Sequence, residues 1–220
     1  MLIFSMSKKY FFLATALLIL LVAIAVSTVK QSTNISIKPV KNPLIEDKAI
    51  ILPINDNDPI YGNPGAPVTV SEFFSFECKE CKQRHEEVIT FIDKNPGKVR
   101  LINKAITQED WLGNKKVFPL LALKCARDQG QYWSFLNQAI KLDKLDENTI
   151  KNLFPTVNLD SGAFSDCLKN TIYENAIKEE QTNLKILGFD KTPIFYINNR
   201  KINPTDDIKL DDILKKIVEE

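Results

Sequence analysis

Apolar residues along this chain repeat with two different periods, and each period predicts one type of element. Residues 68–74 and 99–102 have the short apolar pattern of strands, while residues 78–95 between them have helical spacing. Pro96 and Gly97 separate this helix from the second strand. The pattern therefore predicts a strand–helix–strand unit.

The middle third of the chain shows helical spacing throughout and no strand pattern. Breaks occur at Gly130, Pro155 and Gly188. The predicted helices cover residues 115–128, 131–142, 147–154 and 161–187. An all-helical block therefore follows the strand–helix–strand unit.

The last part of the chain returns to strands. Residues 194–197 and 200–202 flank the pair Asn198-Asn199, which is typical of a tight hairpin turn, and a helix is predicted over about 206–218. Together with the earlier elements, this order predicts an α/β fold in which a helical insertion divides the strand-forming regions.

The N-terminal residues differ from the rest in hydropathy. Residues 10–29 carry no charged side chain and follow Lys8 and Lys9. At a rise of about 1.5 Å per residue, such a helix spans roughly 30 Å, the thickness of the bilayer core. We expect residues 1–30 to form a signal anchor, or a signal peptide cleaved within Ala23–Ser27, with the remaining chain exported.

Composition sets the domain boundaries. Residues 31–57 contain Pro39, Pro43 and Pro53 among polar residues, which favours an extended tether. Within it, residues 49–52 are either a first strand or an apolar part of the tether. Residues 58–220 are sufficient for one domain, with its insertion at about 108–187. The formal net charge is +1 and charges of both signs are interspersed, so nothing indicates nucleic-acid binding.

The run Cys78-Lys79-Glu80-Cys81 carries the main chemical signal, because it lies where the first predicted helix begins. Two thiols at this spacing can close a disulfide ring, and the positive end of the helix dipole favours the reactive thiolate. The motif therefore indicates a redox site.

Three segments resemble the DsbA-type thiol–disulfide oxidoreductases of the thioredoxin superfamily. They are the active-site strand and helix start at 72–81, part of a helical insertion at 125–135, and the strand segment at 188–198 that contains Thr192-Pro193. They occur in the family's order, and the resemblance extends over roughly residues 58–220.

The resemblance implies a thioredoxin fold in which Thr192-Pro193 is a cis-proline pair beside the dithiol. A proline there removes a backbone donor, and a substrate segment can add to the open strand edge. Cys78, at the helix start, is the expected attacking sulfur, and Cys81, nearly a turn further, the buried resolving one.

The two residues between the cysteines depart from the family's pattern, in which proline and, among strong oxidants, histidine are common. Lys79 is expected to favour the Cys78 thiolate and Glu80 to oppose it, which leaves the direction of the reaction open. Alternatively, both are solvated surface residues whose effects partly cancel.

Two further positions bear on proton transfer. The resemblance implies that Glu72 lies beneath the active site as proton acceptor for Cys81, since a buried carboxylic acid can exchange protons near neutral pH. The alternative is a strand glutamate that faces solvent. His85, the single histidine, is expected to be a polar helix residue that points away from the attacking sulfur.

The remaining cysteines, Cys125 and Cys167, fall in the helical insertion. In an exported protein they are expected to form a structural disulfide, with two buried free thiols as the alternative. Trp111 and Trp133 are expected to pack in the core rather than to border a peptide groove.

The leading hypothesis is therefore an extracytoplasmic oxidoreductase, anchored by residues 10–29, that forms or exchanges disulfides in exported proteins. The family implies a membrane redox partner of DsbB type; no cofactor or metal is expected. A reductase or isomerase on the same fold is one alternative. A metal carrier using Cys78, Cys81 and His85 is the other, although a fourth ligand is not evident.

Overall fold

The structure is a computed structural model that describes residues 45–107, 117–204 and 209–219. The predicted membrane-insertion signal and Trp111 lie outside these residues. Among the residues described, none of the helices combines the length and hydropathy needed to cross a bilayer.

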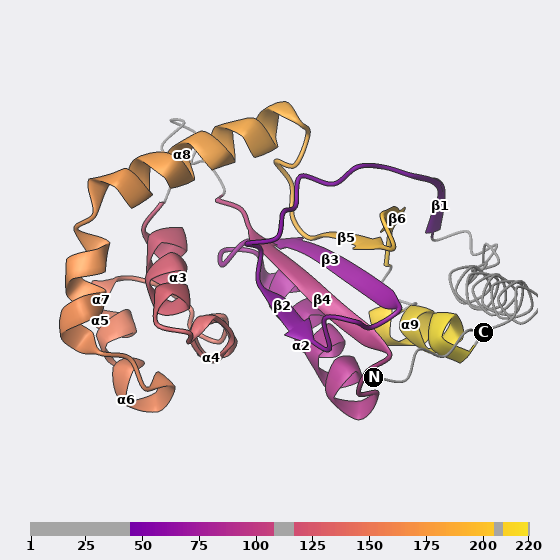
Figure 1. Cartoon of the computed structure of the whole chain (residues 1–220), viewed down its shortest axis with the longest axis horizontal. Coiled ribbons are helices and arrows are strands. Elements are labelled where there is room, and N and C mark those ends of the chain that lie inside the picture. Colours follow the sequence, from indigo (N-terminus) through magenta and orange to yellow (C-terminus); the bar gives the residue numbers. More distant parts are fainter. Residues whose placement is uncertain (1–44, 108–116, 205–208, 220) are drawn as a thin grey trace, which may run out of the picture. The chain divides into compact units, whose positions relative to one another are not determined.

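The elements follow the predicted order (Figure 1). The strands are β1 (Ile45–Ala49), β2 (Ile60–Gly62), β3 (Val68–Phe74), β4 (Val99–Ala105), β5 (Ile194–Ile197) and β6 (Arg200–Ile202). The helices are α2 (Lys79–Lys94), α3 (Phe118–Asp128), α4 (Tyr132–Ala139), α5 (Glu147–Lys151), α6 (Phe154–Val157), α7 (Ser161–Leu168), α8 (Thr171–Ile186) and α9 (Leu210–Glu219).

The six strands form one sheet in the order β1-β6-β5-β3-β4-β2. β3 and β4 are parallel and are joined through α2, whereas the other neighbouring pairs are antiparallel. The β5–β6 hairpin turns at Asn198 and Asn199, whose φ angles of 47° and 65° suit asparagine. The α/β fold with a helical insertion is thus confirmed.

The structure corrects the predicted tether at 31–57. β1 begins at Ile45 and pairs with β6, and the Leu52 side chain is buried against the sheet. The folded unit therefore starts before residue 58. The difference arises because Leu52, together with the partly buried Ile54, packs against the sheet and holds this segment in place.

The predicted helix at 161–187 is two helices, α7 and α8, separated near Asn170. The Asn170 side chain accepts hydrogen bonds from the backbone N–H groups of Ile172 and Tyr173, at 3.0 and 3.3 Å, and so caps α8. An asparagine cap begins a new helix at this point even though the apolar spacing continues.

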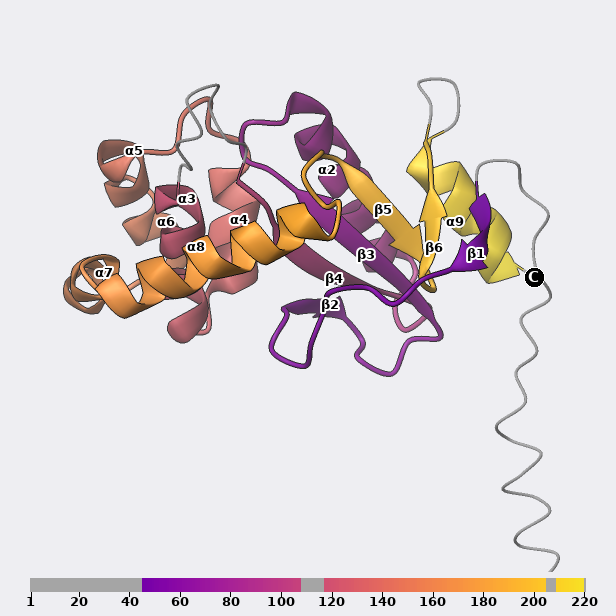
Figure 2. The same cartoon turned by 90° about the horizontal axis from the view of Figure 1, so that it is seen from above.

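The two faces of the sheet are covered by different elements (Figure 2). α2 and α9 pack on one face, in an apolar cluster that includes Val70, Phe91 and Leu214. The end of α8 covers the other face through Leu184, which packs with Phe73. Because strand side chains alternate between faces, Glu72 shares the α2 face with Val70.

The helical insertion has its own core and is attached to the end of β4. α8 runs from α7 back to β5 (Figure 1). From α8, Gln181 donates to the Ala105 carbonyl at 3.2 Å and accepts from the Thr107 N–H at 2.9 Å. These bonds satisfy backbone groups at the end of the strand and hold α8 beside it.

Candidate functional site

Cys78 and Cys81 form a disulfide at the start of α2, with their Cα atoms 5.2 Å apart. Cys78 is the N-cap residue, and its Sγ accepts a hydrogen bond from the Cys81 backbone N–H at 3.1 Å. The first N–H groups of a helix have no partner within the helix. A Cys78 thiolate would therefore gain a hydrogen bond and the positive end of the helix dipole.

The two sulfur atoms differ in access to solvent. Cys78 is partly exposed, whereas Cys81 is completely buried and packs near Phe74 and Phe76. An incoming thiolate can therefore reach Cys78 but not Cys81. This difference in access is compatible with Cys78 as the attacking and Cys81 as the resolving sulfur, and these roles stay a prediction.

Lys79 and Glu80 are both exposed on the first turn of α2. Glu80 also lies 3.8 Å from the guanidinium of Arg84, which is buried except for 3% of its surface. This neighbouring positive charge offsets part of the Glu80 charge, so the effect of Lys79 on Cys78 has less opposition than the sequence suggested.

Glu72 is completely buried, so the alternative of a solvent-facing glutamate is wrong. Its Oε2 lies 2.7 Å from Nδ1 of His85 and accepts a hydrogen bond from Asn103 Nδ2, also at 2.7 Å. Asn103 reaches it from the adjacent position on β4. Whether Glu72 accepts the proton of Cys81 stays a prediction.

His85 differs from its predicted character. It is 1% exposed, bonds to Glu72, and stacks against the rings of Phe74 and Trp133. Sequence reasoning assigned it no role in proton transfer, because its partners lie on other elements. The one available signal was its spacing of four residues from Cys81, which puts both on one face of α2.

The Thr192–Pro193 peptide bond is cis, directly before β5. Ile194 pairs with Phe73, so Pro193 lies at the end of the sheet where β3 leaves for the active-site loop. Both Thr192 and Pro193 are partly buried.

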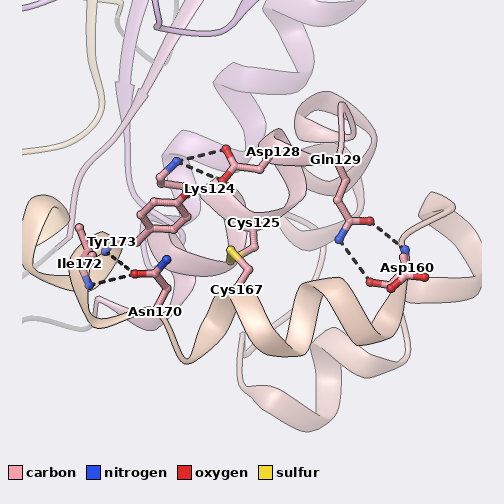
Figure 3. The surroundings of a disulfide bond; sticks show 9 residues. All are labelled: Lys124, Cys125, Asp128, Gln129, Asp160, Cys167, Asn170, Ile172 and Tyr173. Atoms are coloured by element: carbon pink, nitrogen blue, oxygen red, sulfur yellow. Dashed lines mark hydrogen bonds and ion pairs between the residues drawn. A yellow bond between two sulfur atoms is a disulfide. The ribbon is translucent and has the colours of Figure 1, made fainter.

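Cys125 and Cys167 form a second disulfide, which joins α3 to α7 with a Cα–Cα distance of 5.8 Å (Figure 3). Beside it, Gln129 and the backbone of Asp160 exchange two hydrogen bonds, at 3.2 and 2.8 Å. This region therefore links two helices of the insertion covalently and by hydrogen bonds.

A pocket of about 650 Å³ opens beside the active-site loop. Phe76 and Glu77, the residues before Cys78, form one side of it. Its other walls come from α3, α4, α8 and the segment after α4. Apolar and charged side chains both line this pocket close to the active-site loop, which is compatible with binding a peptide segment.

No group of three or more His, Cys, Asp or Glu side chains among the described residues is arranged to bind a metal ion. The site supports thiol–disulfide exchange at a Cys-x-x-Cys disulfide between a strand and a helix. One sulfur is accessible, and His85, one helical turn after Cys81, pairs with the buried carboxylate of Glu72.

Comparison with solved structures shows the same fold in oxidoreductases. A thioredoxin-like oxidoreductase from Silicibacter pomeroyi DSS-3 is 26% identical over 75% of this chain and 92% of its own, with a TM-score of 0.58. BdbD from Bacillus subtilis is 18% identical over 74% of this chain and 94% of its own, with a TM-score of 0.59.

A third similar structure, alpha-DsbA1 from Wolbachia pipientis, is 19% identical over 76% of this chain and 91% of its own, with a TM-score of 0.60. No curated protein gives a significant match. The thioredoxin family model matches residues 54–216. The chain therefore belongs to the thioredoxin family, and it shares its fold with DsbA-like proteins and carries a Cys78–Cys81 disulfide at a helix start.

Proposed function

We propose that this protein forms or exchanges disulfide bonds in exported proteins through a mixed disulfide at Cys78. The observation that carries the proposal is the difference between the two sulfurs. Cys78 is accessible, and its sulfur accepts a hydrogen bond at the start of the helix, whereas Cys81 is buried. The apolar N-terminal residues 10–29 support export and anchoring at the outer face of the membrane.

In the proposed reaction a substrate thiolate attacks the sulfur of Cys78, and Cys81 leaves as a thiolate that takes up a proton. A second substrate thiolate then attacks the substrate sulfur in the mixed disulfide, which releases Cys78. The substrate segment adds along Thr192-Pro193. A membrane redox partner of DsbB type restores the Cys78–Cys81 disulfide in this scheme.

The first test is the reduction potential of the Cys78–Cys81 couple in the full-length protein, equilibrated with glutathione buffers. We expect a value nearer about −120 mV, as for a strong disulfide donor, than about −270 mV, as for thioredoxin. The Cys125→Ser/Cys167→Ser variant retains only the Cys78–Cys81 couple, so an unchanged value in this variant shows that the measured potential belongs to that couple. A value at the reducing end would contradict the oxidising role and favour the reductase or isomerase.

Lys79→Gln is expected to make the couple less oxidising, because loss of the positive charge disfavours the Cys78 thiolate in the reduced protein. Glu80→Gln is expected to act in the opposite direction and more weakly, because Arg84 already offsets the Glu80 charge. Both changes in the glutathione equilibrium constant should stay below about tenfold, since the side chains are exposed. Equal and opposite effects would show that Arg84 does not screen Glu80.

A further inference from the structure

Buried hydrogen bonds connect Glu72 to the helical insertion in two directions. Asn103, which donates to Glu72, accepts a hydrogen bond from the Tyr132 hydroxyl at 2.6 Å. His85, on the other side, has its Nε2 3.3 Å from Oδ1 of Asn137. Tyr132 and Asn137 both belong to α4, so one helix of the insertion contacts both partners of the carboxylate.

These contacts limit where a proton of this cluster can reside. Burial, and then the charges of Glu72 and Asp58, raise the pKa of Tyr132 well above 10, so its hydroxyl stays a donor. This directs Oδ1 of Asn103 toward Tyr132 and its amide N–H toward Oε2 of Glu72. Since Oε2 then accepts hydrogen bonds, a proton resides on Nδ1 of His85 or on the other carboxylate oxygen.

That other oxygen, Oε1 of Glu72, is buried and has no hydrogen-bond partner among the described residues. A buried carboxylate oxygen left without a donor is unfavourable, whereas the same atom can carry a proton at lower cost. The geometry therefore leaves Glu72 one position at which to take up or release a proton.

His85 is the positive group that faces this carboxylate. Burial lowers the pKa of His85, but the charge of Glu72, hydrogen bonds to Glu72 and Asn137, and the charge of Glu86 together raise it above 6.5. On the elements packed against the ring, the titratable groups are Glu72 on β3 and Tyr132 on α4, which is linked to Glu72 through two hydrogen bonds and Asn103. The raised pKa of His85 favours its protonated form, and the 2.7 Å contact places that proton between the His85 ring and Oε2 of Glu72.

Cys81 is the sulfur placed to use that proton. It lies four residues before His85, and both side chains are buried on the face of α2 that packs inward. When an attacking thiolate breaks the disulfide, Cys81 leaves as a buried thiolate, and an unpaired buried charge is costly. A proton from the Glu72–His85 pair, whose histidine lies one helical turn after Cys81, would remove that cost.

We propose that His85 is a positioning residue for exchange at Cys81, because it pairs with Glu72 and retains the proton that Glu72 passes to the leaving thiolate. This inference rests on the proposed function and adds the source of the proton. It also gives α4 of the insertion a role, since Asn137 and Tyr132 orient the two groups that bond to Glu72.

The protons and electrons of the step balance as follows. The substrate thiolate forms a bond to the sulfur of Cys78 while the Cys78–Cys81 bond breaks, and its electron pair stays on Cys81. Cys81 becomes a thiol, and the Glu72–His85 pair changes from one proton and no net charge to a carboxylate with a neutral imidazole. The pair then regains a proton from solvent, and the second substrate thiol releases one before it attacks.

The experiment is an NMR titration of the His85 imidazole in the full-length protein, oxidised and then reduced with dithiothreitol. His85 is the single histidine of the chain, so its signal needs no assignment. We expect the midpoint to differ between the two redox states by at least about half a pH unit, a threefold change in proton affinity. Identical midpoints would overturn the proposal.

A Cys78 thiolate in the reduced protein could shift the His85 signal through space, and Glu72→Gln separates the two causes. If His85 is coupled to Cys81 through Glu72, the redox-dependent difference disappears in this variant. If the difference persists at full size, the coupling does not pass through Glu72 and the proposal is wrong. Because the wild-type titration is measured first, a variant that does not fold leaves the main test intact.

The reciprocal measurement is the pH dependence of the glutathione equilibrium constant. The wild type should show a change of slope at the His85 midpoint, and His85→Gln should lack it, because coupling between two sites acts in both directions. Glu86→Gln, which removes a neighbouring exposed charge on the same helix, is the matched control and should keep the change of slope. An unaltered slope in His85→Gln would also overturn the proposal.

These readouts are independent of whether the protein oxidises exported substrates. Dithiothreitol and glutathione report on the Cys78–Cys81 couple alone. A protein with a redox-linked His85 but a reducing potential would refute the oxidising function and leave the proton assignment standing. An oxidising potential without any redox-dependent shift of the His85 titration would refute the proton assignment and leave the oxidising function standing.

Discussion

Cys81→Ser protein is expected to accumulate as a covalent adduct with its substrates, joined through Cys78. Cys78 is the accessible sulfur and Cys81 is completely buried, so substrates form their mixed disulfide with Cys78 alone. A serine hydroxyl does not attack a disulfide, and a mixed disulfide with a substrate lacking a second thiol then has no route of release. Catalysed peptide oxidation should fall to the background rate.

The measurement is non-reducing electrophoresis of the protein mixed with a peptide that contains one cysteine and is supplied as its glutathione disulfide. Adducts should form with Cys81→Ser and disappear on addition of dithiothreitol. Cys78→Ser should form none, and the Cys125→Ser/Cys167→Ser variant should behave like the wild type. Adducts that depend on Cys81 would show that the roles of the two sulfurs are reversed.

Removal of the Cys125–Cys167 disulfide is expected to lower the free energy of unfolding by about 4 kcal/mol. The two residues are separated by 42 positions, and closing a loop of that length restricts the unfolded chain by about this amount in the chain-entropy model. Domains of this size have about 5–15 kcal/mol of stability, so the loss is large. Denaturant unfolding of the double alanine variant measures it.

The matched control is a variant without the Cys78–Cys81 disulfide, which spans only three positions. In the same model a shorter loop restricts the unfolded chain less, so its removal should destabilise less. If both variants lose equal stability, loop closure is not the source of the effect. The reduction potential of the Cys78–Cys81 couple should be the same with and without Cys125–Cys167.

The helical insertion shows where sequence patterns succeed and where they fail. The four predicted helices overlap α3, α4, α5 and the pair α7 and α8, because apolar side chains at helical spacing mark their buried faces, whereas α6 (Phe154–Val157) was not predicted as a separate helix. The division of 161–187 was missed because apolar spacing continues across Asn170, and the capping role of that side chain depends on backbone geometry.

The first residues of the folded unit were missed for a related reason. Residues 45–57 mix charged and polar side chains with Pro53 and follow a polar stretch that contains Pro39 and Pro43, which is typical of linkers. β1 nevertheless pairs with β6, and Leu52 fills a place against Phe73 and Phe189. Neither partner is near in the sequence, so a local pattern contains no sign of either contact.

Short-range patterns by themselves determined the strand–helix–strand unit, the hairpin at Asn198-Asn199 and the position of Cys78 at a helix start. Each depends on side chains a few residues apart, where periodicity and turn preferences act directly. The tertiary structure alone decided the surroundings of Glu72. His85, Asn103 and Tyr132 reach this cluster from three different elements, and His85 and Asn103 bond to Glu72 across 13 and 31 positions of the chain. Which polar groups meet in the core depends on how the elements pack, because burial forces each group to find whatever partner the fold brings near.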